Sequence, residues 1–169
     1  MKSKKDEIGS LAGTFREHDH AKCASLLLDT ARDLCAERGL RLTPVREKVL
    51  KLLLKSHAPL GAYYILAELA ASGFRAQPPV AYRALDFLVE NGLAHRIEKI
   101  NAFVACSQPH EKHSPIFMIC NDCEQVAETS IKPQGSSLYR TARAIGFDIQ
   151  HTVVEAEGLC AACRERAPM

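Results

Sequence analysis

Apolar residues first recur at helical spacing between Ala21 and Arg38, and this stretch ends at Gly39. A second helix start follows almost at once, because Thr43 is a good N-cap and Pro44 suits the first helical position. The apolar residues that follow lie on one face of a helix that runs to about residue 56. The chain is therefore expected to contain two amphipathic helices joined by a short turn.

Two further helices and a hairpin are predicted next. The third helix covers 62–71, and the fourth covers 78–90, beginning at two prolines and ending at an Asn-Gly pair. The apolar period then becomes that of strands, at 93–97 and 102–106. Helices followed by a hairpin indicate a winged helix-turn-helix, whose last helix enters the major groove of DNA. A small helical domain that binds nothing fits the same pattern.

Beyond Gln108 the composition changes to short strands and cysteines. Strands are predicted at 116–119 and 125–128, a helix over 133–145, and a strand over 147–155. This part has few large apolar residues for its size, so a cross-link is expected to stabilise it. The predicted fold class is α+β, with an N-terminal winged helix-turn-helix domain followed by a small α/β domain.

The predicted domain limits are 1–21, 22–107 and 108–169. The first segment has no firm apolar period and begins with a Lys-rich stretch of mixed charge, which predicts a mobile arm. His18 and His20 are assigned to this arm.

Charge is distributed unevenly along a chain whose net charge is only +2. Residues 22–99 hold twelve Lys and Arg against eight Asp and Glu, whereas residues 100–169 hold six against eight. The N-terminal half is the better candidate to bind a polyanion, although solvated surfaces produce the same difference. Lys5 leads directly into Asp6, which does not fit a secretory signal, and no run of about 18 apolar residues occurs. We expect a cytoplasmic protein that does not bind a membrane.

Four of the seven cysteines form two C-x-x-C pairs, Cys120 with Cys123 and Cys160 with Cys163. This spacing lets both thiolates of a pair bind one tetrahedral ion, and two pairs complete a structural zinc site. In a reducing compartment, metal binding or redox chemistry is favoured over disulfides. A thioredoxin-like redox motif needs its pair at a helix start after a strand in a βαβ unit, a setting that neither pair is expected to have.

Several segments together resemble the ferric uptake regulator family of metal-sensing repressors. They are LRLTPVR at 40–46, YRALDFL at 82–88 and the two C-x-x-C pairs, within a resemblance that spans 23–164. LCAERG at 34–39 and GLCAAC at 158–163 look most like the zinc uptake regulators. The resemblance implies a homodimer, held by its C-terminal domains, that binds an inverted repeat in double-stranded DNA when loaded with metal. It implies no small organic substrate.

The resemblance also implies a regulatory metal site made of His95, Cys106, His113 and Glu128. Two imidazoles, a thiolate and a carboxylate are accepted zinc ligands, although each residue alone is more often an ordinary surface or core residue. The thiolate favours zinc, whereas sensors of iron and manganese use nitrogen and oxygen ligands. About two zinc ions per chain are expected, one structural and one regulatory. The nearby histidines that could join or replace this set are His110 and His151.

A zinc ion held by His95 of the winged helix and Glu128 of the second domain would fix the angle between the domains. That angle sets the spacing of the two recognition helices of a dimer, and only a matching spacing engages two half-sites. The hypothesis is therefore that zinc favours the DNA-binding arrangement.

Arg83 is the first candidate for a DNA contact, since it lies in the first exposed turn of the fourth helix and could bind guanine. Pairing with Asp86 or simple solvation are the alternatives. Valine stands at position 80, where the family usually has a threonine. Valine cannot supply the hydroxyl, and one such hydrogen bond is worth about 0.5–1.5 kcal/mol, so somewhat weaker DNA binding is expected. The remaining candidates are Tyr63, by resemblance, and Tyr82, with possible phosphate contacts from Arg41, Arg46 and Lys51.

The predicted function is a zinc-responsive repressor of zinc uptake genes. The nearest alternative is a member of the same family that senses iron, manganese or peroxide. A thiol-disulfide or zinc enzyme is disfavoured, because the sequence has no His-Glu-x-x-His motif and no placed nucleophile, base and orienting acid. Four protein ligands would also leave no zinc position open to water.

Overall fold

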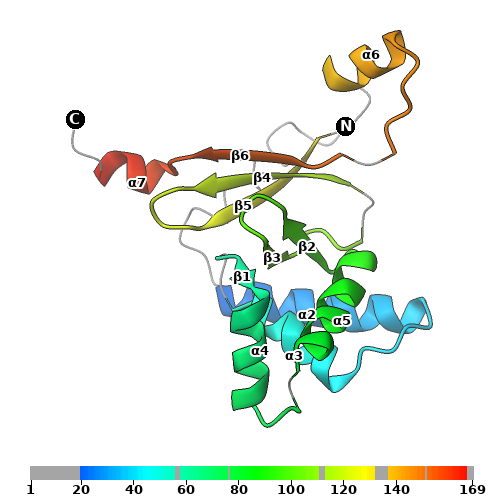
Figure 1. Cartoon of the computed structure of the whole chain (residues 1–169), viewed down its shortest axis with the longest axis vertical. Coiled ribbons are helices and arrows are strands. Elements are labelled where there is room, and N and C mark those ends of the chain that lie inside the picture. The colour runs from blue at the N-terminus through cyan, green and yellow to red at the C-terminus, as the bar shows by residue number, and fades with distance from the viewer. Residues whose placement is uncertain are drawn as a thin grey trace. The chain divides into compact units, whose positions relative to one another are not determined.

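The computed structural model describes residues 20–55, 58–75, 77–110, 113–131, 137–150 and 152–166. The chain divides into two compact units, an N-terminal unit within 18–111 and a C-terminal unit from 112 onward. Each unit has its own sheet (Figure 1). The two units are described separately below.

The N-terminal unit consists of four helices and a three-stranded antiparallel sheet of order β1-β3-β2. Its elements are α2 (His20–Glu37), α3 (Pro44–Leu53), β1 (Leu60–Gly61), α4 (Ala62–Ala71), α5 (Pro78–Glu90), β2 (Ala94–Ile97) and β3 (Ala102–Ala105). The predicted bounds of the third and fourth helices are confirmed. The second helix ends three residues earlier than expected. The winged helix-turn-helix prediction is consistent with this order of helices and hairpin.

Local signals explain why α3 begins where it does. Thr43 has extended backbone angles and its hydroxyl accepts a hydrogen bond from the Arg46 amide at 3.5 Å, while Pro44 occupies the first turn. Its last turns bury Val49, Leu52 and neighbouring leucines in the core. Burying each such side chain contributes about 1.5–3 kcal/mol.

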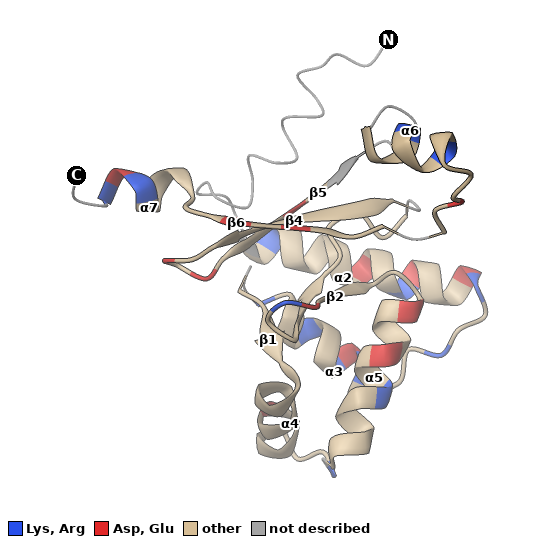
Figure 2. Cartoon of the chain, turned by 45° about the horizontal axis from the view of Figure 1, so that its top comes forward, with Lys and Arg blue, Asp and Glu red and all other residues tan. Residues whose placement is uncertain are grey.

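Helix α5 is positioned by one apolar face. Ala81, Ala84, Leu85 and Leu88 are buried, as the sequence pattern predicts, and they pack with residues of α2, α3 and α4 in a single core. The opposite face of α5 is consequently exposed and includes Arg83, Asp86 and Glu90. Figure 2 marks the charged positions along this helix. The fold therefore presents one side of α5 to solvent.

The C-terminal unit contains a three-stranded sheet of order β5-β4-β6, in which β4 pairs antiparallel with β5 and parallel with β6. Its elements are β4 (Ser114–Cys120), β5 (Val126–Ile131), α6 (Ser137–Ala144), β6 (Val154–Gly158) and α7 (Ala161–Arg166). The predicted strand over 147–155 is wrong for most of its length, since regular pairing begins at Val154. Phe147, Ile149 and Val153 instead line a hollow beside α6 and are at least partly exposed, so their alternation does not mark a strand of the sheet.

Two elements were not predicted from the sequence. Strand β1 has only two residues, too few for an alternating pattern. Helix α7 has six residues and holds no apolar stripe, because its one buried side chain is Cys163. Within the part of the chain that the structure describes, none of the helices has the length and apolarity needed to span a membrane.

An ion-pair network connects α2 to α3. Arg32 lies 2.7 Å from Glu47, and Lys51 lies 2.6 Å from the same carboxylate. The hydrogen bonds from Arg32 and Lys51 lower the pKa of Glu47 from 4.5 to about 2. Because the folded pKa is depressed, the network stabilises the fold above about pH 4.5, and this stabilisation is lost as the pH falls towards 2.

Replacing Glu47 with glutamine tests this network. At pH 7 we expect Glu47→Gln to lower the free energy of unfolding by less than about 1 kcal/mol, because the partners are largely solvated. The deficit should shrink as the pH falls from 4.5 towards 2. Urea unfolding of both proteins at several pH values measures it. Glu37→Gln, at an exposed position of α2, is the matched control, and an equal pH-dependent deficit there would contradict the assignment.

Candidate metal centres and nucleic-acid interface

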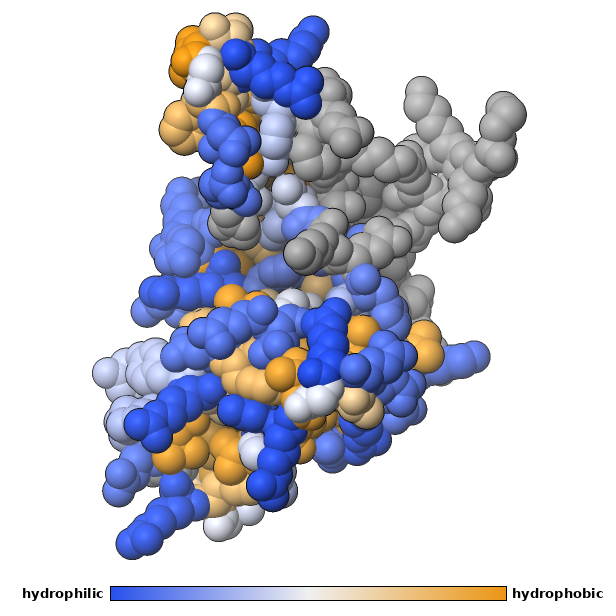
Figure 3. Space-filling view, turned by 90° about the vertical axis from the view of Figure 1, so that its right-hand side faces the viewer, coloured by the Kyte–Doolittle hydropathy of each residue, from blue (hydrophilic) through white to orange (hydrophobic). Residues whose placement is uncertain are grey.

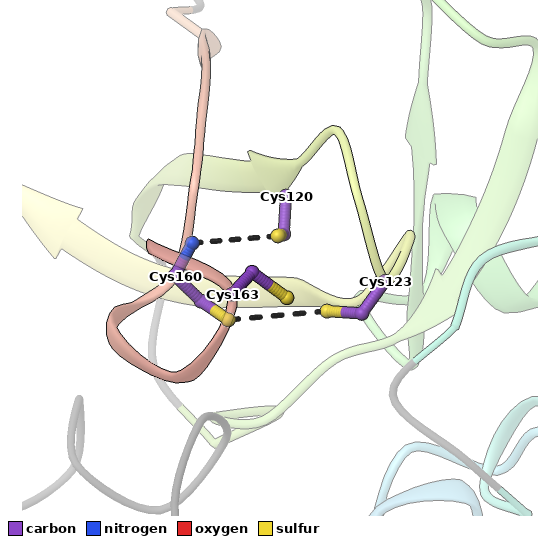
Figure 4. A group of neighbouring side chains, drawn as sticks. All are labelled: Cys120, Cys123, Cys160 and Cys163. Atoms are coloured by element: carbon purple, nitrogen blue, oxygen red, sulfur yellow. Dashed lines mark hydrogen bonds between the residues drawn. The ribbon is translucent and has the colours of Figure 1, made fainter. Parts of the chain in front are cut away.

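The four-cysteine cluster forms where β4 and β6 end side by side. Their parallel register places Cys120 opposite Gly158, and Asn121 donates a backbone hydrogen bond to the Gly158 carbonyl at 2.8 Å. Cys160 follows two residues later, so it reaches the same end of the sheet. The Cys123 and Cys160 sulfurs lie 4.0 Å apart (Figure 4), and all four sulfurs lie within 4.8 Å of one another.

A local backbone hydrogen bond closes a turn at each C-x-x-C pair. In the first pair, the Glu124 amide donates to the Cys120 carbonyl at 3.0 Å, and Glu124 has a left-handed φ of 58°. In the second pair, the Arg164 amide donates to the Cys160 carbonyl at 2.9 Å as α7 begins. Both turns direct their thiols to one point, which is the arrangement that two zinc knuckles require.

The sulfur spacing fits zinc better than a disulfide. A tetrahedral ion with Zn–S bonds of about 2.3 Å separates its sulfurs by about 3.8 Å, close to the 4.0 Å found here. A disulfide would need about 2.05 Å, and all four cysteines are free thiols. The residues present therefore suit a structural zinc ion.

The second pair has only part of the setting of a redox motif. Cys160 and Cys163 lie at the start of a helix after a strand, because β6 leads into α7, but no described strand follows α7 to complete a βαβ unit. The surroundings argue against redox chemistry, since Cys160 lies beside Cys123 of the other pair. A redox reaction uses the two thiols of one pair, so it would not require the two pairs to lie together.

The electrostatic environment differs between the thiols. Backbone N–H groups of Cys123, Cys160 and Asp122 lower the pKa of Cys120 to about 6, and the Cys160 amide is 3.3 Å from its sulfur. The pKa of Cys163 is raised, mainly by its hydrogen bond with the Asp122 side chain, and Arg166 acts in the opposite direction. Cys120 is therefore prepared to bind a cation as a thiolate at neutral pH.

The residues expected to form the regulatory site occur as two pairs, one in each unit. His95 of β2 and Cys106, just after β3, have ligand atoms within 4.8 Å of each other. Their approach follows from the hairpin, where the Cys106 amide donates to the Leu93 carbonyl at 3.0 Å. The N-terminal pair thus offers two ligand atoms within its own unit.

The C-terminal pair is His113, just before β4, and Glu128 of β5. The His113 Nε2 and Glu128 Oε1 atoms lie 2.7 Å apart, and the two side chains are only 8% and 7% exposed. His110, an alternative ligand, is exposed. His151 and His18 lie outside the described residues, and His20 begins α2, with its side chain not described.

Exposed aromatic and basic side chains mark the DNA-facing candidates of the N-terminal unit. Tyr63 is 81% exposed at the start of α4, and Tyr82 is partly exposed on α5. Arg83 is exposed in the same turn, and among the described residues its guanidinium has no hydrogen-bond or ion-pair partner. The suggested pairing with Asp86 is thus not formed. Tyr64, which the sequence reasoning missed, is exposed beside Tyr63.

The three basic residues considered for phosphate binding differ in their surroundings. The Arg46 guanidinium lies 3.6 Å from the Phe87 ring centre and donates to the Arg41 carbonyl at 2.6 Å, so it packs within the unit. Lys51 pairs with Glu47, whereas the Arg41 side chain is exposed. These contacts give Arg46 a structural role that sequence alone did not indicate.

Position 80 is not a helix cap. The N-cap of α5 is Gln77, and Val80 lies three residues further, where its amide donates to the Gln77 carbonyl at 2.8 Å. A threonine hydroxyl lost at this position would consequently matter for a contact outside the helix rather than for capping.

Comparison with known proteins places these features in one family. The ferric uptake regulator family matches residues 37–157 of the chain. The chain belongs to the ferric uptake regulator family. It is 40% identical over 142 residues to the zinc uptake regulation protein of Escherichia coli K12, covering 82% of each chain. The corresponding protein of Shigella flexneri gives the same identity and coverage.

Solved structures of this family agree. A zinc uptake regulator complexed with zinc and DNA is 38% identical, with a TM-score of 0.79 over 85% of this chain and 96% of that one. Holo XcZur is 40% identical, with a TM-score of 0.75 over 84% of this chain and 99% of that one. The resemblance found in the motifs is thus confirmed for the family.

Proposed function

We propose that this member of the ferric uptake regulator family is a zinc-responsive transcriptional repressor. It binds an inverted-repeat operator in double-stranded DNA as a zinc-loaded homodimer in the cytoplasm and controls zinc uptake genes. The observation that carries the proposal is a winged helix followed by two separate thiolate-containing ligand sets. The names of the relatives, a zinc uptake regulation protein and a zinc uptake regulator bound to zinc and DNA, support it.

Zinc is preferred over iron or manganese because of Cys106. This buried thiol accompanies His95 in the N-terminal half of the regulatory set. Thiolate ligands suit zinc, whereas carboxylate and imidazole alone would suit the other two metals. The proposed content is two zinc ions per chain, one held by the four cysteines and one by His95, Cys106, His113 and Glu128.

Regulation follows from the division of the second ligand set between the units. A tetrahedral ion needs four ligands, and each unit supplies two of them. His95 and Cys106 can therefore share an ion with His113 and Glu128 only in a limited range of arrangements of the two units. If that range matches the spacing of the operator half-sites, zinc raises DNA affinity, and a nearly complete switch requires about 5.5 kcal/mol of preference.

Operator binding with and without the regulatory zinc tests this proposal. Purified protein should contain about two zinc ions per chain, and mild chelation should remove one. Losing that ion should weaken operator binding by about 5- to 150-fold, the range of ordinary allosteric coupling. Cys106→Ser should hold one zinc and bind weakly at any zinc level. Metal analysis and fluorescence anisotropy at constant salt measure both.

Cys23→Ser is the matched control for Cys106→Ser, because Cys23 is a partly exposed cysteine of α2 outside both clusters. It should keep both ions. A protein with a single zinc that binds its operator equally well at every zinc concentration would rule out the proposed regulator. Tighter operator binding with iron or manganese would favour the alternative sensors.

The dimer contact is proposed at the apolar surface of α6 and the segment after it. Ile145 and Phe147 are 76% and 63% exposed, and Figure 3 shows orange side chains gathered over α6. A hollow of about 390 Å³ lies beside them, lined also by Leu138 and Val153. Contiguous exposed apolar surface of this kind marks an interaction site. A second copy of the chain is the proposed occupant.

A charge placed in that surface should separate the dimer. We expect Ile145→Asp to shift sedimentation at micromolar concentration towards the monomer, because a carboxylate cannot be buried there unpaired. Arg143→Gln changes the net charge equally, two residues away at the end of α6, and should remain dimeric. Dimers of unchanged stability in both variants would place the contact elsewhere.

Arg83, Tyr63 and Tyr82 are the proposed contacts to the operator, with Arg41, Arg46 and Lys51 near phosphates. The unpaired and exposed Arg83 guanidinium of α5 can donate two hydrogen bonds to a guanine edge. Arg46 is a weaker candidate for a phosphate contact, because its guanidinium already lies over the Phe87 ring and donates to the Arg41 carbonyl. Arg83 is thus the strongest candidate for base recognition.

The Arg83 assignment predicts a loss of specificity. A guanine contact is worth about 1–3 kcal/mol of discrimination, so Arg83→Ala should weaken operator binding by about 5- to 150-fold and binding to scrambled DNA much less. Competition assays at fixed salt measure both affinities. Arg164→Ala removes the same charge from the C-terminal unit and serves as the control. Equal losses on both DNAs would make Arg83 a phosphate contact.

A further inference from the structure

Arg166, at the end of α7, lies beside the four-cysteine cluster but is not one of its ligands. Its guanidinium donates a hydrogen bond to the Cys163 sulfur at 3.0 Å. The same Nη2 atom lies 3.5 Å from the Asp122 carboxylate. Asp122 belongs to the loop between Cys120 and Cys123, so one side chain contacts a cysteine of the second pair and the loop of the first.

Helix geometry explains this double contact. Arg166 follows Cys163 by three residues, about one turn of α7, so the two side chains lie on the same face of that helix. Asp122 is contributed by the turn after β4, 44 positions earlier in the chain. The Arg166 side chain therefore connects the helix carrying the second pair to the loop carrying the first.

The cluster is open on one side, and Arg166 lies at that opening. A groove of about 450 Å³ is lined by Cys123, Cys160 and Cys163 together with Arg166. Cys120 does not line the groove; Cys120 and Cys163 are only 2% and 3% exposed, whereas Cys123 and Cys160 are partly exposed. A competing ligand or a proton would approach the sulfurs from the groove, where the Cys163 sulfur is the one that Arg166 covers.

Arg166 also compensates negative charge at the proposed zinc site. Four thiolates around one zinc ion leave two negative charges in excess, and the nearby Asp122 carboxylate adds another. A guanidinium is permanently charged and can donate to a bound thiolate without competing for the metal. Such outer hydrogen bonds orient metal ligands and tune the affinity for the metal.

We propose that Arg166 is a positioning residue that retains zinc in the four-cysteine site by joining Cys163 to the Asp122 loop. This inference rests on the proposed structural zinc. Its effect should appear in the rate of zinc loss rather than in the fold, because Arg166 and Asp122 are 68% and 58% exposed. Exposed ion pairs contribute little to folding itself.

The experiment follows zinc transfer from the full chain to an excess of the chromogenic chelator 4-(2-pyridylazo)resorcinol. The regulatory zinc is removed first by mild chelation, so the remaining slow phase reports the four-cysteine site. Arg166→Ala should accelerate that phase about 10-fold, the lower end of the range for outer-shell partners, because the residue is exposed. Arg166→Lys keeps the charge with fewer donors and should fall between.

Arg164→Ala is the matched control, since it removes the same charge from an exposed position of the same helix. Its release rate should equal that of the unaltered protein. If Arg166 acts through Asp122, Arg166→Ala should also have a smaller effect in an Asp122→Asn background. Cobalt substitution gives a second readout, because the thiolate-to-metal absorption should shift in Arg166→Ala and stay unchanged in Arg164→Ala.

Two results would count against the inference in different ways. If the slow phase of zinc release has the same rate in Arg166→Ala and in the unaltered protein, the role of Arg166 is overturned but the four-cysteine centre is not. An unaltered protein without any slowly released zinc would overturn the four-cysteine centre and this inference with it.

Discussion

Four thiolates at the end of one small sheet are the feature on which the C-terminal unit depends. Its described core is modest, with Phe117, Ile119 and Val126 among the few large buried side chains. A core of this size contributes little beyond the conformational entropy lost on folding, so a unit of this kind commonly needs a metal or disulfides. Because the cysteine pairs meet only after β4 and β6 have paired, binding of the proposed zinc ion would be coupled to folding.

The N-terminal unit is stabilised instead by a large apolar core. It buries a continuous set of leucine, isoleucine and alanine side chains from four helices, and it needs no ion for that purpose. Its polar surface is consequently free for other roles. The exposed face of α5 is available to DNA, and His95 with Cys106 at the end of the hairpin is available to a removable ion. A metal that leaves this unit need not unfold it.

The two proposed ions thus differ in what they require of the protein. The four cysteines lie within one unit, so their ion can be retained as long as that unit is folded. The regulatory ligands are divided into two pairs, so their ion depends on the relative arrangement of the units as well. This difference in connectivity, more than any difference in donor atoms, separates the proposed structural ion from the proposed regulatory ion.

Local sequence signals determined much of this protein. The bounds of α4 and α5, the Thr43 cap of α3 and the paired cysteines depend on turn, capping and ligand spacing, which act over a few residues. These signals, with the motifs at 40–46 and 82–88, were sufficient to identify the family and the α+β class, both of which are confirmed.

Tertiary structure decided what depends on distant residues. The alternation after Gly146 predicted a strand, but these residues line a hollow beside α6, and pairing with β4 begins only at Val154. Arg46 matched the pattern of a phosphate contact, yet Phe87, 41 positions away, holds its guanidinium. The sequence did not indicate a role for Arg166, because that role depends on its contact with Asp122. The pairing of β4 with β6 brings these two residues together. A sequence pattern records the preference of each residue, whereas only folding determines which partners satisfy it.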